Sequence, residues 1–265
     1  MTEEVTSDIQ SMPTPPPAES GKPYLPVWGP WQTTGLGLAI LLIDTIAQAW
    51  VLLTLAAREF LANPDLDILT LITNLITDGS IMSRSIIVSG AVGVAMTIVF
   101  IKARRRASIR EYLALKPLSR KQVLISLGVV AGLMALLEGI SELTGQVPDT
   151  GFNLELYQTA EPVALLWVAF VIFAPAFEEV FFRGFLFAGW ERSRLGSVGT
   201  IILTSVLWGI LHLQYDLFGI VAIMIMGITI GIMRHKTKSL WSTLLMHFAW
   251  NLTAMTMLAL YPGGG

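Results

Sequence analysis

Long apolar runs alternate with short polar segments along almost the whole chain after residue 30. Seven of these runs approach the roughly 20 residues that a helix needs to cross a membrane, although the fifth and sixth are short. The runs cover residues 34–57, 86–103, 123–143, 162–190, 197–213, 216–233 and 239–260. A shorter run from Leu66 to Thr77 is interpreted as an amphipathic or re-entrant helix, with an eighth span as the alternative. The pattern predicts an all-α fold: a polytopic transmembrane helix bundle of about seven spans with one extra amphipathic or re-entrant helix.

The composition agrees with a membrane protein. Of the 265 residues, 54% are hydrophobic and only 14% are charged, whereas soluble domains carry about 25% charged residues. The mean hydropathy is +0.66, so the expected surroundings are a lipid bilayer. The net charge of -2 gives no indication of a nucleic-acid partner. The chain has no cysteine, which excludes disulfides, thiolate catalysis and cysteine-ligated metals.

Three parts are expected along the chain. Residues 1–30 are polar and rich in proline, without the basic start and apolar centre of a signal peptide, and are predicted to form a disordered cytoplasmic tail. Residues 31–160 form N-terminal membrane helices. Residues 161–260 form a membrane core that carries the polar motifs described below.

The charges of the loops predict an orientation. Three loops are basic, and basic loops remain on the cytoplasmic side. They contain Arg104, Arg105, Arg106, Arg110, Lys116, Arg120 and Lys121, then Arg192 and Arg194, then Arg234, Lys236 and Lys238. The loop after the third span is acidic, with Asp149 and Glu155. Seven spans then place the N-terminus in the cytoplasm and the C-terminus outside, in an integral protein of the cell membrane. An eighth span near Leu66 would move the N-terminus outside.

Ionisable side chains inside the fourth span are the most informative feature. Glu178, Glu179 and Arg183 lie within six residues of an apolar run, and such groups at bilayer depth usually face a protein interior or a wet cavity. Glu179 and Arg183 are four residues apart and share a helix face, so they are predicted to pair, whereas Glu178 points elsewhere and is the candidate base. The alternative is an ion pair that only fixes helix packing. Pro175 should free the carbonyl of Val171 and kink the helix.

Two later spans each carry a histidine. Trp208 and His212 are four residues apart, and so are His247 and Asn251, so each pair shares one helix face. A single histidine in an apolar helix is more often a hydrogen-bonded packing residue than a catalyst. Together with the glutamates, however, three helices bring polar groups into the membrane interior. One cavity that all of them line is therefore expected. His235 lies in a basic loop and is given no role.

Three motifs in this order resemble the type II CAAX prenyl protease and bacteriocin-processing family of intramembrane proteases, also called Abi or CPBP. The resemblance covers about 162–255, and Trp208 stands where phenylalanine is usual. The motifs are Glu178-Glu179-x-x-x-Arg183, Trp208-x-x-x-His212 and His247-x-x-x-Asn251. The resemblance implies a multi-helix membrane endopeptidase whose catalytic core is 161–260. Its partner would be a protein or peptide substrate, including lipidated ones; no oligomeric state is implied.

The resemblance also implies roles for six residues. Glu178 as base, with His212 as its partner, would activate water. The pair of Glu179 and Arg183 would orient that base. His247 and Asn251 would donate hydrogen bonds to the tetrahedral oxyanion.

No cofactor is expected on this reading, and three alternatives stay open. Zinc held by Glu178, His212 and His247 ranks second, since the chain lacks a His-Glu-x-x-His motif. A non-catalytic membrane scaffold or immunity protein could use the same fold. A proton-coupled transporter would also use buried Glu and His, but no internal repeat supports it.

Overall fold

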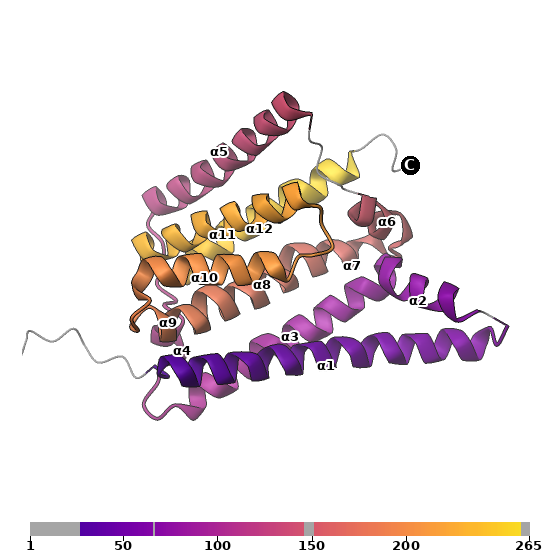
Figure 1. Ribbon diagram of the computed structural model, residues 1–265, viewed down its shortest axis with the longest axis horizontal. Coiled ribbons are helices and arrows are strands. Elements are labelled where there is room, and N and C mark those ends of the chain that lie inside the picture. The colour runs from indigo at the N-terminus through magenta and orange to yellow at the C-terminus, as the bar shows by residue number, and fades with distance from the viewer. Residues whose placement is uncertain (1–26, 66, 146–150, 261–265) are drawn as a thin grey trace, which may run out of the picture.

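The computed structural model describes residues 27–65, 67–145 and 151–260, and within these ranges it contains helices and no strand. Long helices run back and forth between the two ends of the bundle (Figure 1). The helices are α1 Pro30–Ala62, α2 Ile68–Thr77, α3 Gly79–Ala103, α4 Ile109–Tyr112, α5 Arg120–Thr144, α6 Gly151–Thr159, a continuous helix Val163–Trp190 that contains α7 to α9, α10 Gly196–Ile210, α11 Leu217–Thr237 and α12 Leu240–Ala259. The predicted all-α class is confirmed for the described residues.

Five helices are long and apolar enough to cross a membrane, so the prediction of seven spans is confirmed in part. They are α1, α3, α5, the helix 163–190 and α11. The helix α10 falls short because it has only 15 residues. The helix α12 has 20 residues, but its serine, threonine, histidine and asparagine side chains make it less apolar. The predicted extra helix near residue 66 is present as α2, whose 10 residues cover only about 15 Å.

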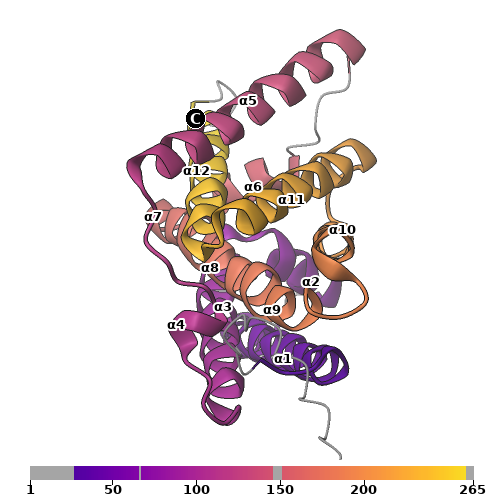
Figure 2. The ribbon, with the colours of Figure 1, turned by 90° about the vertical axis from the view of Figure 1, so that its left-hand side faces the viewer.

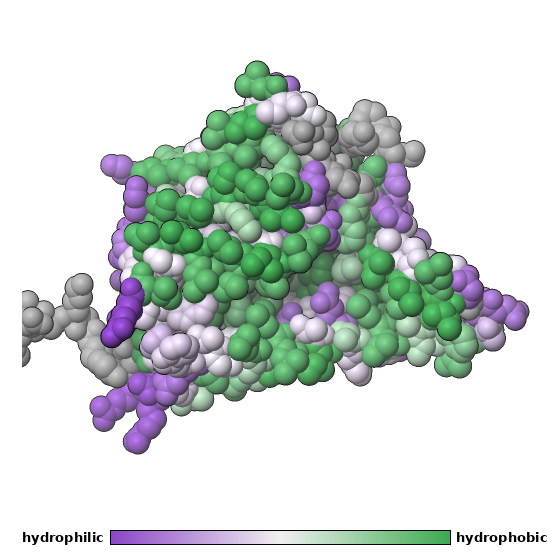
Figure 3. Space-filling view, viewed as in Figure 1, coloured by the Kyte–Doolittle hydropathy of each residue, from purple (hydrophilic) through white to green (hydrophobic). Residues whose placement is uncertain are grey.

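The three basic loops lie at the same end of the bundle. The ends of α3, α9 and α11 meet the starts of α5, α10 and α12 there, at the left of Figure 1. The start of α1 lies at this end and the end of α12 at the other. Figure 3 shows an apolar surface between hydrophilic patches toward the two ends. The assignment of the basic end to the cytoplasm stays a prediction, and residues 1–26 of the predicted tail lie outside the described residues.

The helix 163–190 occupies the centre of the bundle. Figure 2 shows it between α1 and α3 on one side and α11 and α12 on the other. The helix α3 approaches it closely through two glycines. A Cβ at Gly90 would lie 3.1 Å from the carbonyl oxygen of Phe173, and a Cβ at Gly93 would clash with the ring of Phe177. The central helix therefore packs against α3 just before its glutamates.

Candidate active site

The central helix changes its hydrogen-bond register along its length. Its successive segments are α7 Val163–Trp167, η1 Val168–Phe173, α8 Ala174–Glu178, η2 Glu179–Leu186 and α9 Phe187–Trp190, in which η marks π-helix. A π-helix pairs residues five apart rather than four, is rare, and occurs frequently at functional sites. The two π segments lie on either side of α8, which ends at Glu178. The sequence pattern did not predict this change of register.

Pro175 has no backbone N–H, and the π register decides which carbonyl loses its donor. In η1 the N–H of Ala174 donates to the carbonyl of Ala169, five residues earlier. The next pair in the same register would join residue 175 to Phe170. The carbonyl left without a donor is therefore that of Phe170, and not that of Val171 as predicted from an α-helix.

Asn251 supplies the missing donor. Its Nδ2 donates to the Phe170 carbonyl over 2.7 Å, across from α12 to the central helix. An amide nitrogen carries two N–H groups, so a second remains for another acceptor. The site residue predicted on α12 thus also stabilises the backbone of η1.

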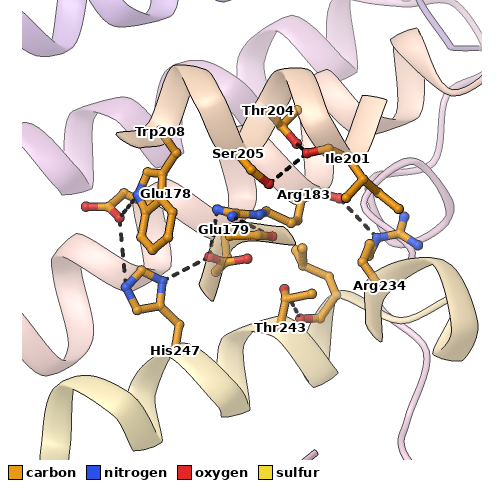
Figure 4. Close-up of polar contacts among 12 residues, drawn as sticks. Glu178, Glu179, Arg183, Ile201, Thr204, Ser205, Trp208, Arg234, Thr243 and His247 are labelled. Atoms are coloured by element: carbon orange, nitrogen blue, oxygen red, sulfur yellow. Dashed lines mark hydrogen bonds and ion pairs between the residues drawn. The ribbon is translucent and has the colours of Figure 1, made fainter. Parts of the chain in front are cut away.

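Glu179 and Arg183 form the predicted pair. Arg183 Nη1 lies 3.2 Å from Glu179 Oε1, and both side chains are completely buried. The Nδ1 of His247 lies 2.9 Å from the same carboxylate oxygen. The other oxygen of Glu179 and the Nε of Arg183 are also buried, and neither has a partner among the described residues. Figure 4 shows the three side chains meeting from the central helix and α12.

Glu178 has different surroundings from its neighbour. Trp208 Nε1 donates to Glu178 Oε2 over 2.5 Å, and His247 Nε2 lies 3.9 Å from that oxygen. The Glu178 side chain is 20% exposed, whereas that of Glu179 is 0% exposed. The adjacent carboxylates are thus unequal: one is locked by a cation, and the other remains accessible.

His212 lies just beyond the end of α10 and, among the described contacts, does not touch Glu178. Its Nδ1 is 2.7 Å from the carbonyl oxygen of Trp208. Because a carbonyl only accepts, this Nδ1 carries the hydrogen and Nε2 is the free nitrogen. The His212 ring meets the Trp208 ring edge to face at 5.2 Å and stacks on Tyr215 at 6.2 Å. His212 and Glu178 therefore both contact Trp208.

Comparison with known families identifies the core. Residues 160–253 match the family model of the type II CAAX prenyl endopeptidase Rce1-like proteins. The chain carries an Rce1-like domain. This confirms the predicted family, and the match includes the central helix, α10, α11 and most of α12. No curated protein and no solved structure matches the chain significantly.

The Rce1-like domain contains an arginine that sequence reasoning assigned only to a basic loop. Arg234, on α11, is 5% exposed, and its Nε donates to the backbone carbonyl of Arg183 over 3.0 Å. In return, Arg183 Nη2 donates to the carbonyl of Gly227 on α11 over 3.3 Å. Positions 227 and 234 are about two turns apart on one face of α11. Two opposed hydrogen bonds thus join α11 to η2.

The glycine at this junction permits the close approach. A Cβ at Gly227 would lie 3.0 Å from the Cβ of Ser205 and 3.1 Å from Arg183 Nη2. The face of α11 that carries Gly227 therefore packs within the Rce1-like domain, against α10 and the central helix.

Proposed function

We propose that this protein is an intramembrane glutamate-dependent endopeptidase that hydrolyses a peptide bond with water activated by Glu178 and His212. The observation that supports the proposal is the inequality of Glu178 and Glu179. A general base must be accessible and free to take a proton, whereas a residue that only orients the site is better buried and paired. Glu178 meets the first requirement and Glu179 the second.

The proposed chemistry uses each group at a stated atom. Glu178 takes a proton from water as the water oxygen bonds to the peptide carbonyl carbon. His212, whose Nε2 is free, accepts a hydrogen bond from the same water. The proton then passes to the departing amine as the C–N bond breaks, so no redox partner is needed. Both residues contact Trp208, which supports a shared site for the two.

The tetrahedral oxyanion needs fixed donors in a site poor in water. The Glu179 carboxylate binds Nδ1 of His247 and orients its ring. His247 is proposed as one of the oxyanion donors. Asn251 retains one N–H beyond its bond to Phe170. Arg183 donates to the same oxygen of Glu179 and helps to hold it in place.

The proposed substrate class follows from the matched family, whose members are described as CAAX prenyl endopeptidases. Such enzymes act on a C-terminal Cys-aliphatic-aliphatic-X sequence with a prenylated cysteine. The alternative is a non-catalytic scaffold or immunity protein with the same fold, and this alternative requires no turnover.

A cleavage assay in detergent separates these functions. The probes are an internally quenched peptide with a farnesylated CAAX terminus and the same peptide without the lipid. The matched variants are Glu178→Gln and Glu138→Gln, since Glu138 is an exposed glutamate on α5. Loss of a general base should slow cleavage by about 10²–10⁴-fold, and Glu138→Gln should leave the rate unchanged. Wild-type turnover in Glu178→Gln would contradict the assigned base, and a wild type that cleaves neither probe would favour the scaffold.

The zinc alternative has its own test. Within the described residues, no three His, Asp or Glu side chains lie close enough together to hold a metal ion. The proposed mechanism uses no metal. Activity should survive exhaustive chelation, with far less than one metal per chain by elemental analysis. Stoichiometric zinc, with activity lost on its removal and restored on its return, would contradict the glutamate mechanism.

A further inference from the structure

Trp208 contacts four of the six candidate residues at once. Besides its hydrogen bond to Glu178, its ring lies edge to face against both histidines, with centroids 5.2 Å from His212 and 5.2 Å from His247. The guanidinium carbon of Arg183 lies 4.7 Å from the ring centroid. The indole is only 2% exposed. Figure 4 shows Trp208 reaching from α10 toward the glutamates of the central helix.

Close packing of α10 on both sides of Trp208 holds the indole in place. Three residues before it, Ser205 contacts the Gly227 position of α11. One residue after it, a Cβ at Gly209 would lie 2.5 Å from Met224 of α11. A shift or rotation of α10 would bring either position into collision with α11. The segment of α10 that carries the indole is therefore closely packed against α11 on both sides of Trp208.

The indole N–H binds one oxygen of Glu178. An indole donates and cannot accept, so this oxygen is the acceptor of the bond. It occupies Oε2, and Oε1 has no hydrogen-bond donor among the described residues. Hydrogen bonds that involve an ionised group are the stronger kind. A phenylalanine, the usual residue at this position of the motif, has no such donor.

We infer that Trp208 is the positioning residue of the base: its indole N–H holds Glu178 Oε2, so that Oε1 faces the water to be activated. This inference rests on the proposed function, because it concerns the same glutamate. It assigns a role to the indole nitrogen beyond the aromatic packing that a phenylalanine would also supply.

The test replaces Trp208 while preserving its ring. Trp208→Phe keeps an aromatic ring against both histidines and Arg183 but lacks the N–H. Loss of a hydrogen bond to a charged group should lower kcat for the farnesylated peptide by about 10–100-fold with KM nearly unchanged. A variant with 3-benzothienylalanine at position 208 should do the same, because sulfur replaces the N–H in an almost identical bicyclic shape. The 3-benzothienylalanine variant provides the same test if Trp208→Phe does not fold.

Trp190→Phe is the matched control. The indole of Trp190 is also buried, at 6% exposed, and donates to Thr34 Oγ1 over 3.1 Å. It follows Glu178 by 12 residues on the same helix, or roughly 18 Å. This variant should lose some thermal stability and keep its kcat. An unchanged kcat in both position-208 variants, with Glu178→Gln inactive, would overturn the role of Trp208 and leave the proposed function standing.

An infrared measurement tests the inference without turnover. The carboxylate stretch of Glu178 is the band that disappears in the difference spectrum between wild type and Glu178→Gln. This band should shift in the 3-benzothienylalanine variant and stay in place in Trp190→Phe, because only the first loses the hydrogen bond to Oε2. The same band position in wild type and the position-208 variant would overturn the inference, whatever the peptides show.

Discussion

Two membrane helices with similar apolar sequences, α5 and the central helix 163–190, have different structures. Both are long and apolar enough to cross a bilayer. The helix α5 is a single α-helix of 25 residues. The central helix changes register between α and π, and two of its ionisable side chains, Glu179 and Arg183, are completely buried. The comparison shows how a peripheral membrane helix with a largely apolar exposed face differs from the central helix that carries the candidate site.

The helix α5 satisfies its own backbone. Ser119 and Gln122 form a capping box at its start, and the regular register pairs the groups along its length. Large apolar side chains point outward, with Leu124 70% exposed, Leu136 59% and Leu143 89%. Such a surface suits acyl chains, which offer no hydrogen bonds.

The central helix depends on its neighbours instead. Asn251 of α12 donates to a carbonyl of η1, and Arg234 of α11 donates to a carbonyl of η2. These two side chains serve backbone groups that lie on either side of Glu178. The direction of the glutamates is therefore set by three helices together, and each support can be removed by a single substitution.

The largest effect on stability is expected from Glu179→Gln. This change leaves Arg183 as a buried cation without its partner, and breaking a buried ion pair costs about 3–5 kcal/mol. Thermal unfolding in one detergent measures the loss. Glu138→Gln on α5 is the matched control and should melt with the wild type, because Glu138 is exposed. Equal melting temperatures for the two variants would show that the buried glutamate of the central helix contributes no more to stability than the exposed glutamate of α5.

Asn251→Ala should have the next largest effect. It removes one of the two proposed oxyanion donors, and loss of such a donor slows turnover by about 10²–10³-fold. It also leaves the Phe170 carbonyl without its donor. The control is Thr253→Ala on the same helix, because the Thr253 hydroxyl donates only to the carbonyl of Ala249 in its own helix. A rate for Asn251→Ala equal to that of Thr253→Ala would show that neither role matters to catalysis.

Local spacing was sufficient to predict part of this site. Glu179 and Arg183 are four residues apart and share a face in both registers, so their pairing survives the change from α to π. The apolar runs predicted the positions of the helices, because a helix that crosses lipid needs a long stretch of apolar residues. The convergence of His247 on the glutamates was expected from three polar helices in one core, and a family match covers the same segment.

Tertiary contacts account for what local spacing did not predict. The π segments have partners 44 to 81 residues away, and no local pattern contains them. Arg234 looked like one cation of a basic loop because Lys236 and Lys238 follow it closely in the sequence, and these two lysines are indeed exposed. The helix α6 was missed because its sequence is polar and short. The donor to Glu178 was missed because an aromatic residue was interpreted by its ring and not by its nitrogen.

The smallest of these effects is expected from Arg234→Met. Methionine keeps much of the length and the packing on Phe187 but cannot donate to the Arg183 carbonyl. Loss of a hydrogen bond from a charged donor should cost about 1.5–3 kcal/mol. The local readout is hydrogen–deuterium exchange of the peptide 179–190, whose amides should exchange faster when η2 loses its external donor.

His235→Met provides the control for Arg234. His235 contacts Glu191, the acid that also interacts electrostatically with Arg234, but it makes no bond to the central helix. If the bond to the Arg183 carbonyl matters, only Arg234→Met should speed exchange in 179–190, and both variants should leave α5 unchanged. Faster exchange in both variants would show that the effect comes from the lost interactions with Glu191 and not from the bond to the Arg183 carbonyl. No change in either would mean that η2 is stable by itself, and the contrast with α5 would then rest on Asn251 alone.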